Sequence, residues 1–256
     1  MISSKFTKHV ITVTCLLSIA VNTNAQNSEF GLFLGGSYYM GELNPRKHFA
    51  EVTSPAIGIY HDAHINSRYS WRTIATFGKL KANDNLTEIG LNNYRNLQFE
   101  TNIYELSGQI HFNFLPYGSS ITKKPFTPYI FVGLAIFHVN PHVSSIGSDT
   151  LSTALPKEDY TRTLTSVSMP FGLGFKAIFG TISLGIEWSF RKTFTDDVDG
   201  VDNQYSIGNI NDEPEQYPQP KGFQKGTFNT FDWYSYAGIT ISFRPGPKKN
   251  SCPAMN

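Results

Sequence analysis

Apolar and polar residues alternate in several separate segments of the chain that follows residue 27. Residues 181–191 (TISLGIEWSFR) show the pattern most clearly, with Ile182, Leu184 and Ile186 at every second position. Successive side chains of an extended strand point to opposite faces, so this spacing predicts a strand with one apolar face. Further segments repeat the pattern, and one more, 127–140, is apolar on both faces and could by itself be a buried strand of another fold. Together these segments predict strands over residues 29–39, 56–66, 69–79, 104–114, 127–140, 165–177, 181–191 and 233–243.

The connections between these segments alternate in length. Short or moderate connections are expected at 66–68, 115–126 and 179–180, and long ones at 40–54, 80–98, 141–163 and 195–231. Short turns at one end and long loops at the other are typical of outer-membrane barrels. The pattern therefore predicts an all-β fold, an eight-stranded antiparallel transmembrane β-barrel, whose outward side chains meet outer-membrane lipid and whose two ends lie in the periplasm.

Two residues depart from the strand pattern. His61 interrupts an apolar face, and Pro170 lies inside the strand expected at 165–177. Proline cannot donate to a strand ladder, so we expect a bulge at Pro170.

The first 25 residues have the layout of a secretory signal peptide. Lys5 and Lys8 precede an apolar stretch over 10–21, and small residues stand before Gln26. That stretch is too short to span a membrane and predicts a cleaved export signal. We therefore expect three segments: a signal peptide at 1–25, a barrel at 26–243 and a periplasmic C-terminal tail at 244–256.

The charge and the aromatic content of the chain limit what kind of protein it can be. The chain has 21 basic and 20 acidic residues, and the predicted signal takes two of the basic ones. So balanced a charge argues against a nucleic-acid partner. The 20 Phe, 13 Tyr and 21 Gly suit a strand-rich protein with aromatic girdles.

Charged residues also occur at positions that face the interior of the predicted barrel. An eight-stranded barrel is filled by side chains rather than water, so these groups are expected to pair as a charge-matched plug. A role in conduction or catalysis is the alternative. The predicted lumenal charge network consists of Arg72, Glu105, His111, Lys176, Glu187 and Arg191.

Signals for chemistry are weak. Asp196, Asp197, Asp199 and Asp202 offer clustered carboxylates that suit calcium, but no closing glutamate follows at the spacing of a calcium loop, so a solvated acidic loop is the simpler interpretation. The histidines lack metal-ligand spacing, and the chain has no nucleophile elbow. We expect no cofactor, no metal and no enzymatic activity.

Six motifs in order along the chain resemble one family. They are GGSYYMGELNP (35–45), FETNIYEL (99–106), TPYIFVG (127–133), PFGLGFK (170–176), EWSFRKTFTD (187–196) and DWYSYAGIT (232–240). Together they resemble the PorG family, the outer-membrane barrel subunit of the type IX secretion system. The resemblance implies a non-enzymatic barrel that associates with a periplasmic ring, made of a lipoprotein and its partner protein, and supports protein secretion and often gliding motility. Two alternatives stay open: a stand-alone small barrel with adhesive or membrane-stabilising loops, and an enzyme active at the rim.

The C-terminal tail carries the last cysteine of the chain. Cys252 has no partner within the mature chain, because Cys15 lies in the predicted signal. In an oxidising compartment a leftover cysteine suggests an intermolecular disulfide. The tail is thus either an end without fixed structure or a strap that contacts a partner through Cys252.

Overall fold

The computed structural model describes residues 28–40, 53–83, 97–117, 125–145, 159–161, 163–195, 198 and 232–244. The predicted signal peptide lies outside these residues. These described residues form ten strands: β1 (Ser28–Met40), β2 (Ser54–His64), β3 (Tyr69–Asn83), β4 (Leu97–Asn113), β5 (Phe126–Val139), β6 (His142–Ser145), β7 (Asp159–Thr161), β8 (Leu164–Phe179), β9 (Ile182–Thr193) and β10 (Trp233–Phe243).

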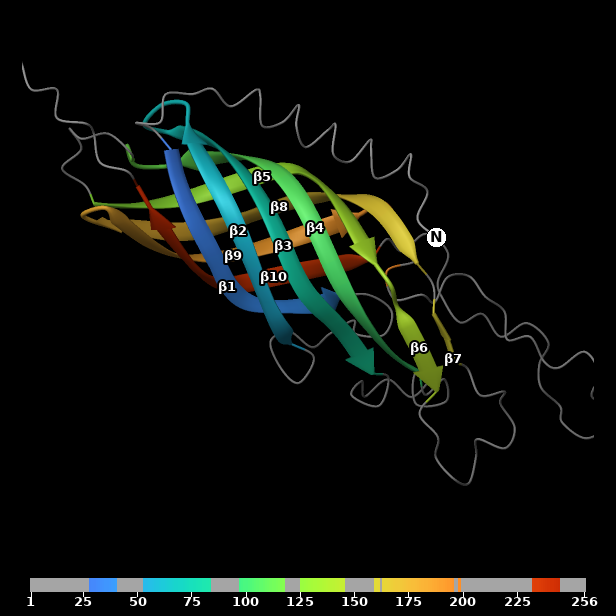
Figure 1. Ribbon diagram of the computed structural model, residues 1–256. Helices are drawn as coiled ribbons and strands as arrows, with labels where there is room; N and C mark the ends of the chain where they lie inside the picture. The colour runs from blue at the N-terminus through green and yellow to red at the C-terminus, as the bar shows by residue number, and fades with distance from the viewer. Residues whose placement is uncertain are drawn as a thin grey trace, which may run out of the picture.

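Eight long strands close into an antiparallel barrel. Their order is β3-β2-β1-β10-β9-β8-β5-β4, and β3 pairs with β4 to close the ring. Closure leaves no barrel strand with an unpaired edge, which a sheet immersed in lipid requires. The eight-stranded barrel predicted from the alternation is therefore confirmed, and Figure 1 shows its strongly tilted strands.

Short connections lie at one end of the barrel and long ones at the other. Gly180 has a φ of 67° in the turn between β8 and β9, the left-handed conformation that two-residue hairpin turns favour. We call this the short-turn end. The opposite end, where β1, β3, β5 and β9 finish, is the long-connection end.

At the long-connection end the strands reach further than the alternation predicted. β3 continues to Asn83 and β4 begins at Leu97, so the connection expected at 80–98 is shorter, and β6 and β7 occupy part of the one expected at 141–163. In Figure 1 these two strands extend beyond the barrel. Outward residues there, such as Lys81 and Glu100, are polar. The apolar alternation ends where the strands leave the lipid, although their pairing continues.

The bulge expected at Pro170 is wrong. The register between β5 and β8 is the same on both sides of Pro170, and Pro170 itself pairs with Arg191 on β9. Pairing with β5 is interrupted only opposite Gly133 and Leu134. The missing N–H is therefore accommodated by a short gap in one ladder, without an inserted residue.

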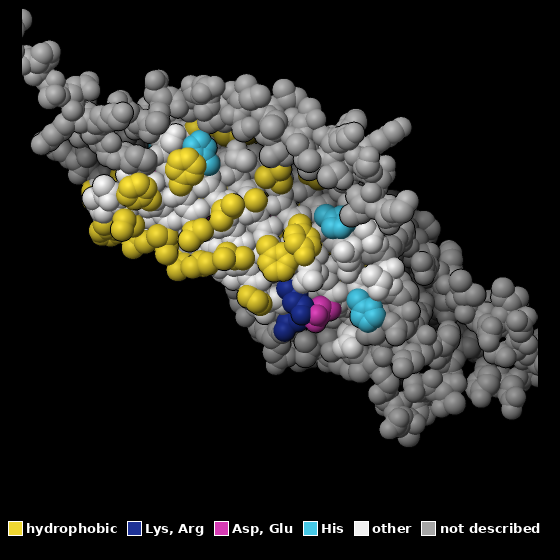
Figure 2. Space-filling model, in the orientation of Figure 1, with side chains coloured by type: hydrophobic (Ala, Val, Ile, Leu, Met, Phe, Trp, Pro, Cys, Tyr) yellow, Lys and Arg dark blue, Asp and Glu magenta, His cyan; other side chains and the backbone are white. Residues whose placement is uncertain are grey.

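Apolar side chains cover the outside of the barrel. Figure 2 shows such side chains gathered in a band on one face of the barrel. Around the whole barrel the most exposed of them include Ile59, Leu134 and Ile186, at 64, 71 and 61 %. The described residues contain no helix long and apolar enough to cross a membrane.

Aromatic side chains border this band on both sides. Phe243 marks the short-turn side of β10 and Trp233 the other side, and Tyr69 and Phe77 do the same on β3. Ten residues at about 3.3 Å each, tilted by about 40°, span about 25 Å, which is the height of the apolar band of an outer-membrane barrel. The outer surface is therefore built for a bilayer.

Leu134→Lys tests this surface. Leu134 is the most exposed large apolar residue in the described chain, so the substitution would cost little in water. In the middle of a bilayer we expect it to lower the free energy of unfolding by about 2–4 kcal/mol. Unfolding in lipid vesicles measures the change. The control is Asn102→Lys, exposed on β4 near the long-connection end, where about 0–1 kcal/mol is expected.

Candidate functional site: a charged and closed lumen

Arg72 is the centre of the lumen. It lies on β3, is 2 % exposed, and donates through Nε to Asp62 Oδ1 at 2.6 Å and through Nη2 to Asp62 Oδ2 at 2.8 Å. Its Nη1 donates to Glu187 Oε2 at 2.8 Å from the other side of the barrel. Tyr129 donates to the same oxygen at 2.8 Å, and the guanidinium lies 4.1 Å from the Tyr60 ring centre. One arginine thus joins β2, β3 and β9 across the interior.

Arg191 forms a second layer nearer the long-connection end. Its Nε lies 3.2 Å from Glu105 Oε2, and its guanidinium is 4.3 Å from the Tyr236 ring centre. Tyr234 donates to Glu105 Oε2 at 2.7 Å. Ser189 accepts a further hydrogen bond from Arg191. The layer ties β4, β9 and β10 together, and its carboxylate and guanidinium are both paired.

Glu29 organises the third layer, at the short-turn end. Its carboxylate lies 2.9 Å from His64 Nε2 and accepts from Ser242 Oγ at 2.8 Å. Arg244, the residue after β10, donates to it through Nε at 3.1 Å. Glu29 therefore fastens β1 to β2 and to the exit of the C-terminal tail.

Both ends of the lumen are closed by side chains. At the long-connection end a layer of buried apolar residues fills the cross-section of the lumen. These residues are Tyr39, Leu80, Phe99, Ile103, Phe137, Val139 and Val198. At the short-turn end Tyr117, 1 % exposed, turns inward, and its hydroxyl lies 2.6 Å from Ser183 Oγ. Burial raises the pKa of Tyr117, so its phenol stays neutral. The space between Phe33, Ile74 and Arg191 is too small to hold a water molecule.

All six residues predicted for the lumenal charge network lie inside the barrel, and none is more than 6 % exposed. Two ion pairs form among them: Arg191 pairs with Glu105, and Arg72 pairs with Glu187. His111 stacks on Phe131 at 4.8 Å, and its Nε2 lies 3.0 Å from Gln109 Oε1. His111 therefore packs against the aromatic wall and carries no ion pair.

Two carboxylates of the lumen were missing from the sequence prediction. Asp62 binds Arg72, and Glu29 binds His64 and Arg244. Alternation alone places both on the inward face, so the signal was present. The sequence did not indicate which residues pair with each other, because Asp62 and Glu187 lie on opposite walls of the barrel and meet only through Arg72.

The other predicted sites lie beyond the described residues. Asp196, Asp197, Asp199 and Asp202 belong to that group, as does Cys252. In the part of the chain that the structure describes, no group of three or more His, Cys, Asp or Glu side chains is arranged to hold a metal ion.

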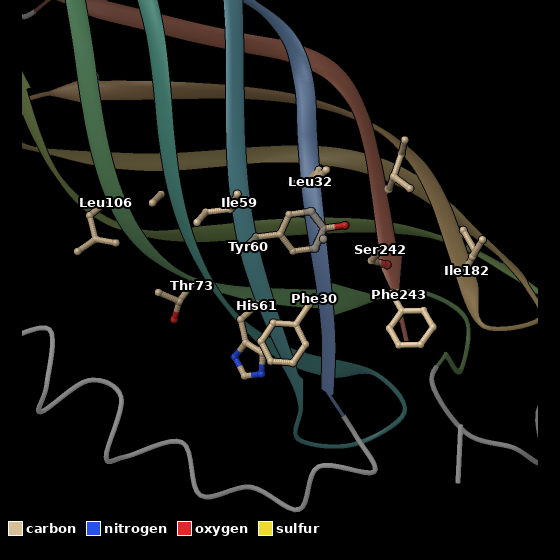
Figure 3. Close-up of a pocket in the computed structure, with 13 residues that line it drawn as sticks. Phe30, Leu32, Ile59, Tyr60, His61, Thr73, Leu106, Ile182, Ser242 and Phe243 are labelled. Atoms are coloured by element: carbon tan, nitrogen blue, oxygen red, sulfur yellow. The ribbon is translucent and has the colours of Figure 1, made fainter. Parts of the chain in front are cut away.

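A groove of about 720 Å³ lies on the outside of the barrel, over β1, β2 and β10. Figure 3 shows Phe30 and His61 at one side and Phe243 at the other. The His61 ring packs against the Phe30 ring in a tilted arrangement, with the ring centres 4.7 Å apart, so His61 belongs to the aromatic border of the band. Gly31 leaves room for the Tyr60 ring on the inner side of this wall, because a Cβ there would lie 2.3 Å from Tyr60 Cζ. The groove is apolar and faces lipid, so acyl chains suit it.

These features define the class of protein. A closed eight-stranded barrel with an exposed apolar band, two aromatic borders and a polar, filled interior is an outer-membrane β-barrel of the small type. The chain belongs to the DUF6089 family (Domain of unknown function), whose model matches residues 7–254. No curated protein matches the sequence.

Several solved outer-membrane barrels are similar in structure. Neisserial surface protein A is 10 % identical, with a TM-score of 0.43 over 86 % of this chain and 97 % of its own. A major outer membrane protein of Thermus thermophilus is 10 % identical, with a TM-score of 0.43 over 84 % and 98 %. Ail, the attachment invasion locus protein of Yersinia pestis, is 9 % identical, with a TM-score of 0.40 over 84 % and 96 %.

The buried pairing predicts a large cost for Glu187→Ala. The substitution leaves Arg72 with one carboxylate partner and Tyr129 without an acceptor, and breaking such a buried pair costs about 3–5 kcal/mol. The matched control is Glu100→Ala, which removes the exposed partner of Lys79 and should cost about 0–1 kcal/mol. Denaturant unfolding in detergent compares the two. Equal losses would mean that water screens the lumen.

The closed lumen predicts that the protein is not a pore. In a planar lipid bilayer the purified barrel should give no stable conductance, because aromatic and charged side chains fill its section at every layer. A steady open channel would contradict the filled interior.

Proposed function

We propose that this barrel is a non-enzymatic outer-membrane subunit of the type IX protein secretion machinery, and that it binds the periplasmic ring of that machinery. The observation that carries the proposal is the ordered series of six motifs that resemble the PorG family. The series extends from 35–45 to 232–240 and so runs through the barrel wall from β1 to β10. Participation in gliding motility belongs to the same proposal.

The filled lumen is compatible with this role. The interior holds paired charges and has no passage for a solute, so cargo does not cross through it. A small closed barrel can act instead as a rigid anchor in the membrane. Its available surfaces are the lipid-facing wall, the short turns and the long connections.

The short-turn end is the proposed contact surface for the ring. Because β1 begins and β10 finishes at this end, and because long loops are expected outside the cell, this end faces the periplasm in our proposal. Hydrogen bonds hold the β2–β3 turn at this end in one conformation. Asn66 caps the β2–β3 turn by accepting from the backbone N–H of Arg68 and of Tyr69, both at 2.8 Å. Arg68 in turn donates to the Phe114 carbonyl at 2.7 Å.

Site-specific photo-crosslinking in living cells tests the proposal. A photoreactive amino acid at Thr181, exposed in the β8–β9 turn, should give an adduct with the ring lipoprotein or its partner, identified by mass spectrometry. The same group at Asn140, exposed at the long-connection end, is the matched control and should give none. Deleting the gene should also retain secreted cargo in the periplasm, and the wild-type chain should restore its release.

Two results would contradict the proposal. Normal secretion after deletion would favour a stand-alone barrel, and ring adducts only from Asn140 would reverse the orientation.

The contribution of the C-terminal tail to ring binding is measured in the same cells. If Cys252 forms a disulfide with a ring protein, non-reducing gels show a heavier band that Cys252→Ser abolishes. If the band is absent and secretion is normal in this variant, the disulfide is excluded.

A further inference from the structure

Aromatic side chains gather on one side of the outer wall, at the long-connection border of the apolar band. They come from four strands that are neighbours around the barrel, β1, β10, β9 and β8. Each has the same position in the strand alternation as the exposed apolar residues of its strand, so it points outward. We call this cluster the aromatic platform, and it consists of Tyr38, Phe171, Trp188, Phe190 and Trp233.

Contacts between the rings hold the platform together. Phe171 and Phe190 face each other in the β8–β9 register and stack with their ring centres 5.8 Å apart. Trp233 meets Phe171 edge-on at 5.9 Å, and Trp188 lies 4.9 Å from Phe190. The indole N–H of Trp188 donates to the Tyr38 hydroxyl at 2.7 Å. The platform is therefore a fixed surface and not a set of independent side chains.

The hydrogen bond between Trp188 and Tyr38 spans a whole strand. β10 lies between β1 and β9, and its outward residues there are Ser235, which pairs with Tyr38, and Ala237, which pairs with Trp188. Because both residues are small, the indole can cross β10 and reach Tyr38. The platform is thus continuous over four strands, a width of about 14 Å.

Lys192 adds a positive charge to the platform. It follows Phe190 by two residues on β9 and pairs with Trp233, and its ammonium lies 5.9 Å from the centre of a Trp233 ring. Among the described residues this is the only cation–ring contact on the outer wall, and no carboxylate lies within ion-pair distance of Lys192. On the opposite wall, by contrast, Lys79 contacts Glu100. Lys192 is therefore available to an anionic group outside the protein.

The border at the short-turn end differs. It also has aromatic pairs, such as Tyr69 with Phe112 and Phe126 with Phe175. No cation contacts these rings within the part of the chain that the structure describes. The two borders are thus suited to lipids of different headgroups.

We propose that the aromatic platform and Lys192 bind one molecule of lipid A, the phosphorylated disaccharide glycolipid of the outer leaflet. The ammonium pairs with a phosphate, and the flat ring faces receive the apolar C–H faces of the sugars. The acyl chains continue down the apolar band over Leu173, Ile186 and Ile239. This inference is independent of the secretion role, but it rests on the proposed orientation, with the long-connection end outside.

A disaccharide suits this surface better than a phospholipid headgroup does. One phosphate on a glycerol needs only the lysine and a neighbouring ring, whereas the platform presents five rings over four strands. A lysine binds phosphate as a point charge, so the rings supply the shape selection. Loss of the charge and loss of the rings should therefore have separable effects.

Native mass spectrometry of the full barrel in detergent tests the charge. Bis-phosphorylated lipid A should bind as a single adduct, and more tightly than phosphatidylethanolamine. Lys192→Met should weaken its binding about tenfold, the effect of losing one charged hydrogen bond. Lipid A without phosphates should bind the wild type and Lys192→Met equally.

The matched control is Lys79→Met, which removes an outward lysine near the same end of the opposite wall and should leave the affinity unchanged. Equal affinity of the wild type and Lys192→Met for bis-phosphorylated lipid A would overturn the proposal. A preference of the wild type for phosphatidylethanolamine would overturn it too.

Trp188→Leu tests the rings in the same assay. It removes the side chain that crosses β10, so it should weaken the binding of lipid A both with and without phosphates. Phe179→Leu, at an exposed aromatic residue of the short-turn border, is the control and should bind as the wild type does. An unchanged affinity in Trp188→Leu would contradict the proposal.

Photochemistry in living cells separates this inference from the secretion role. A photoreactive amino acid at Met169, which pairs with Lys192 on the outer wall, should give an adduct with lipid A. The same group at Phe179 should give adducts with phospholipid. Phospholipid at Met169 and lipid A at Phe179 would reverse the orientation and overturn the proposal, whether or not ring proteins are captured from Thr181.

Discussion

The contact of Arg72 with Asp62 and Glu187 is the interaction on which the interior of this barrel depends. Eight strands enclose too little space for bulk water, so each inward charge must find its partner across the lumen. Arg72 does this for two carboxylates on opposite walls, and Arg191 and Arg244 repeat the arrangement with one carboxylate each. A buried ion pair is not by itself strong evidence of stability, but the loss of one partner is costly. The wall is therefore held in one shape from inside.

The outer surface must be apolar, whereas the interior holds paired charges, because the outer surface faces lipid. Apolar residues between two aromatic borders cover it, and polar residues return where β3 and β4 extend beyond the band. Along each strand, residues that face the lipid therefore alternate with residues that face the polar interior. A small barrel of this kind is a rigid body with no passage, which is why the proposed function assigns it anchoring and contact rather than transport.

The two ends of the lumen differ in chemistry. The long-connection end is sealed by apolar side chains around Phe99 and Phe137, whereas the short-turn end holds Glu29, His64 and Lys176 beneath Tyr117. Polar atoms without protein partners are concentrated at that end.

The sequence by itself determined the barrel, because a period of two is a local property of a strand and lipid admits only strands that close on themselves. It placed Arg72, Glu105, Lys176, Glu187 and Arg191 on the inward face for the same reason. It did not show that β3 and β4 continue beyond the lipid, since their outward residues turn polar there while backbone pairing persists. Pairing across the lumen was decided only by the tertiary structure. Which inward side chain contacts Arg72 depends on the tilt of the strands and on their register around the closed barrel. Neither can be predicted from the alternation of apolar and polar residues in a single strand.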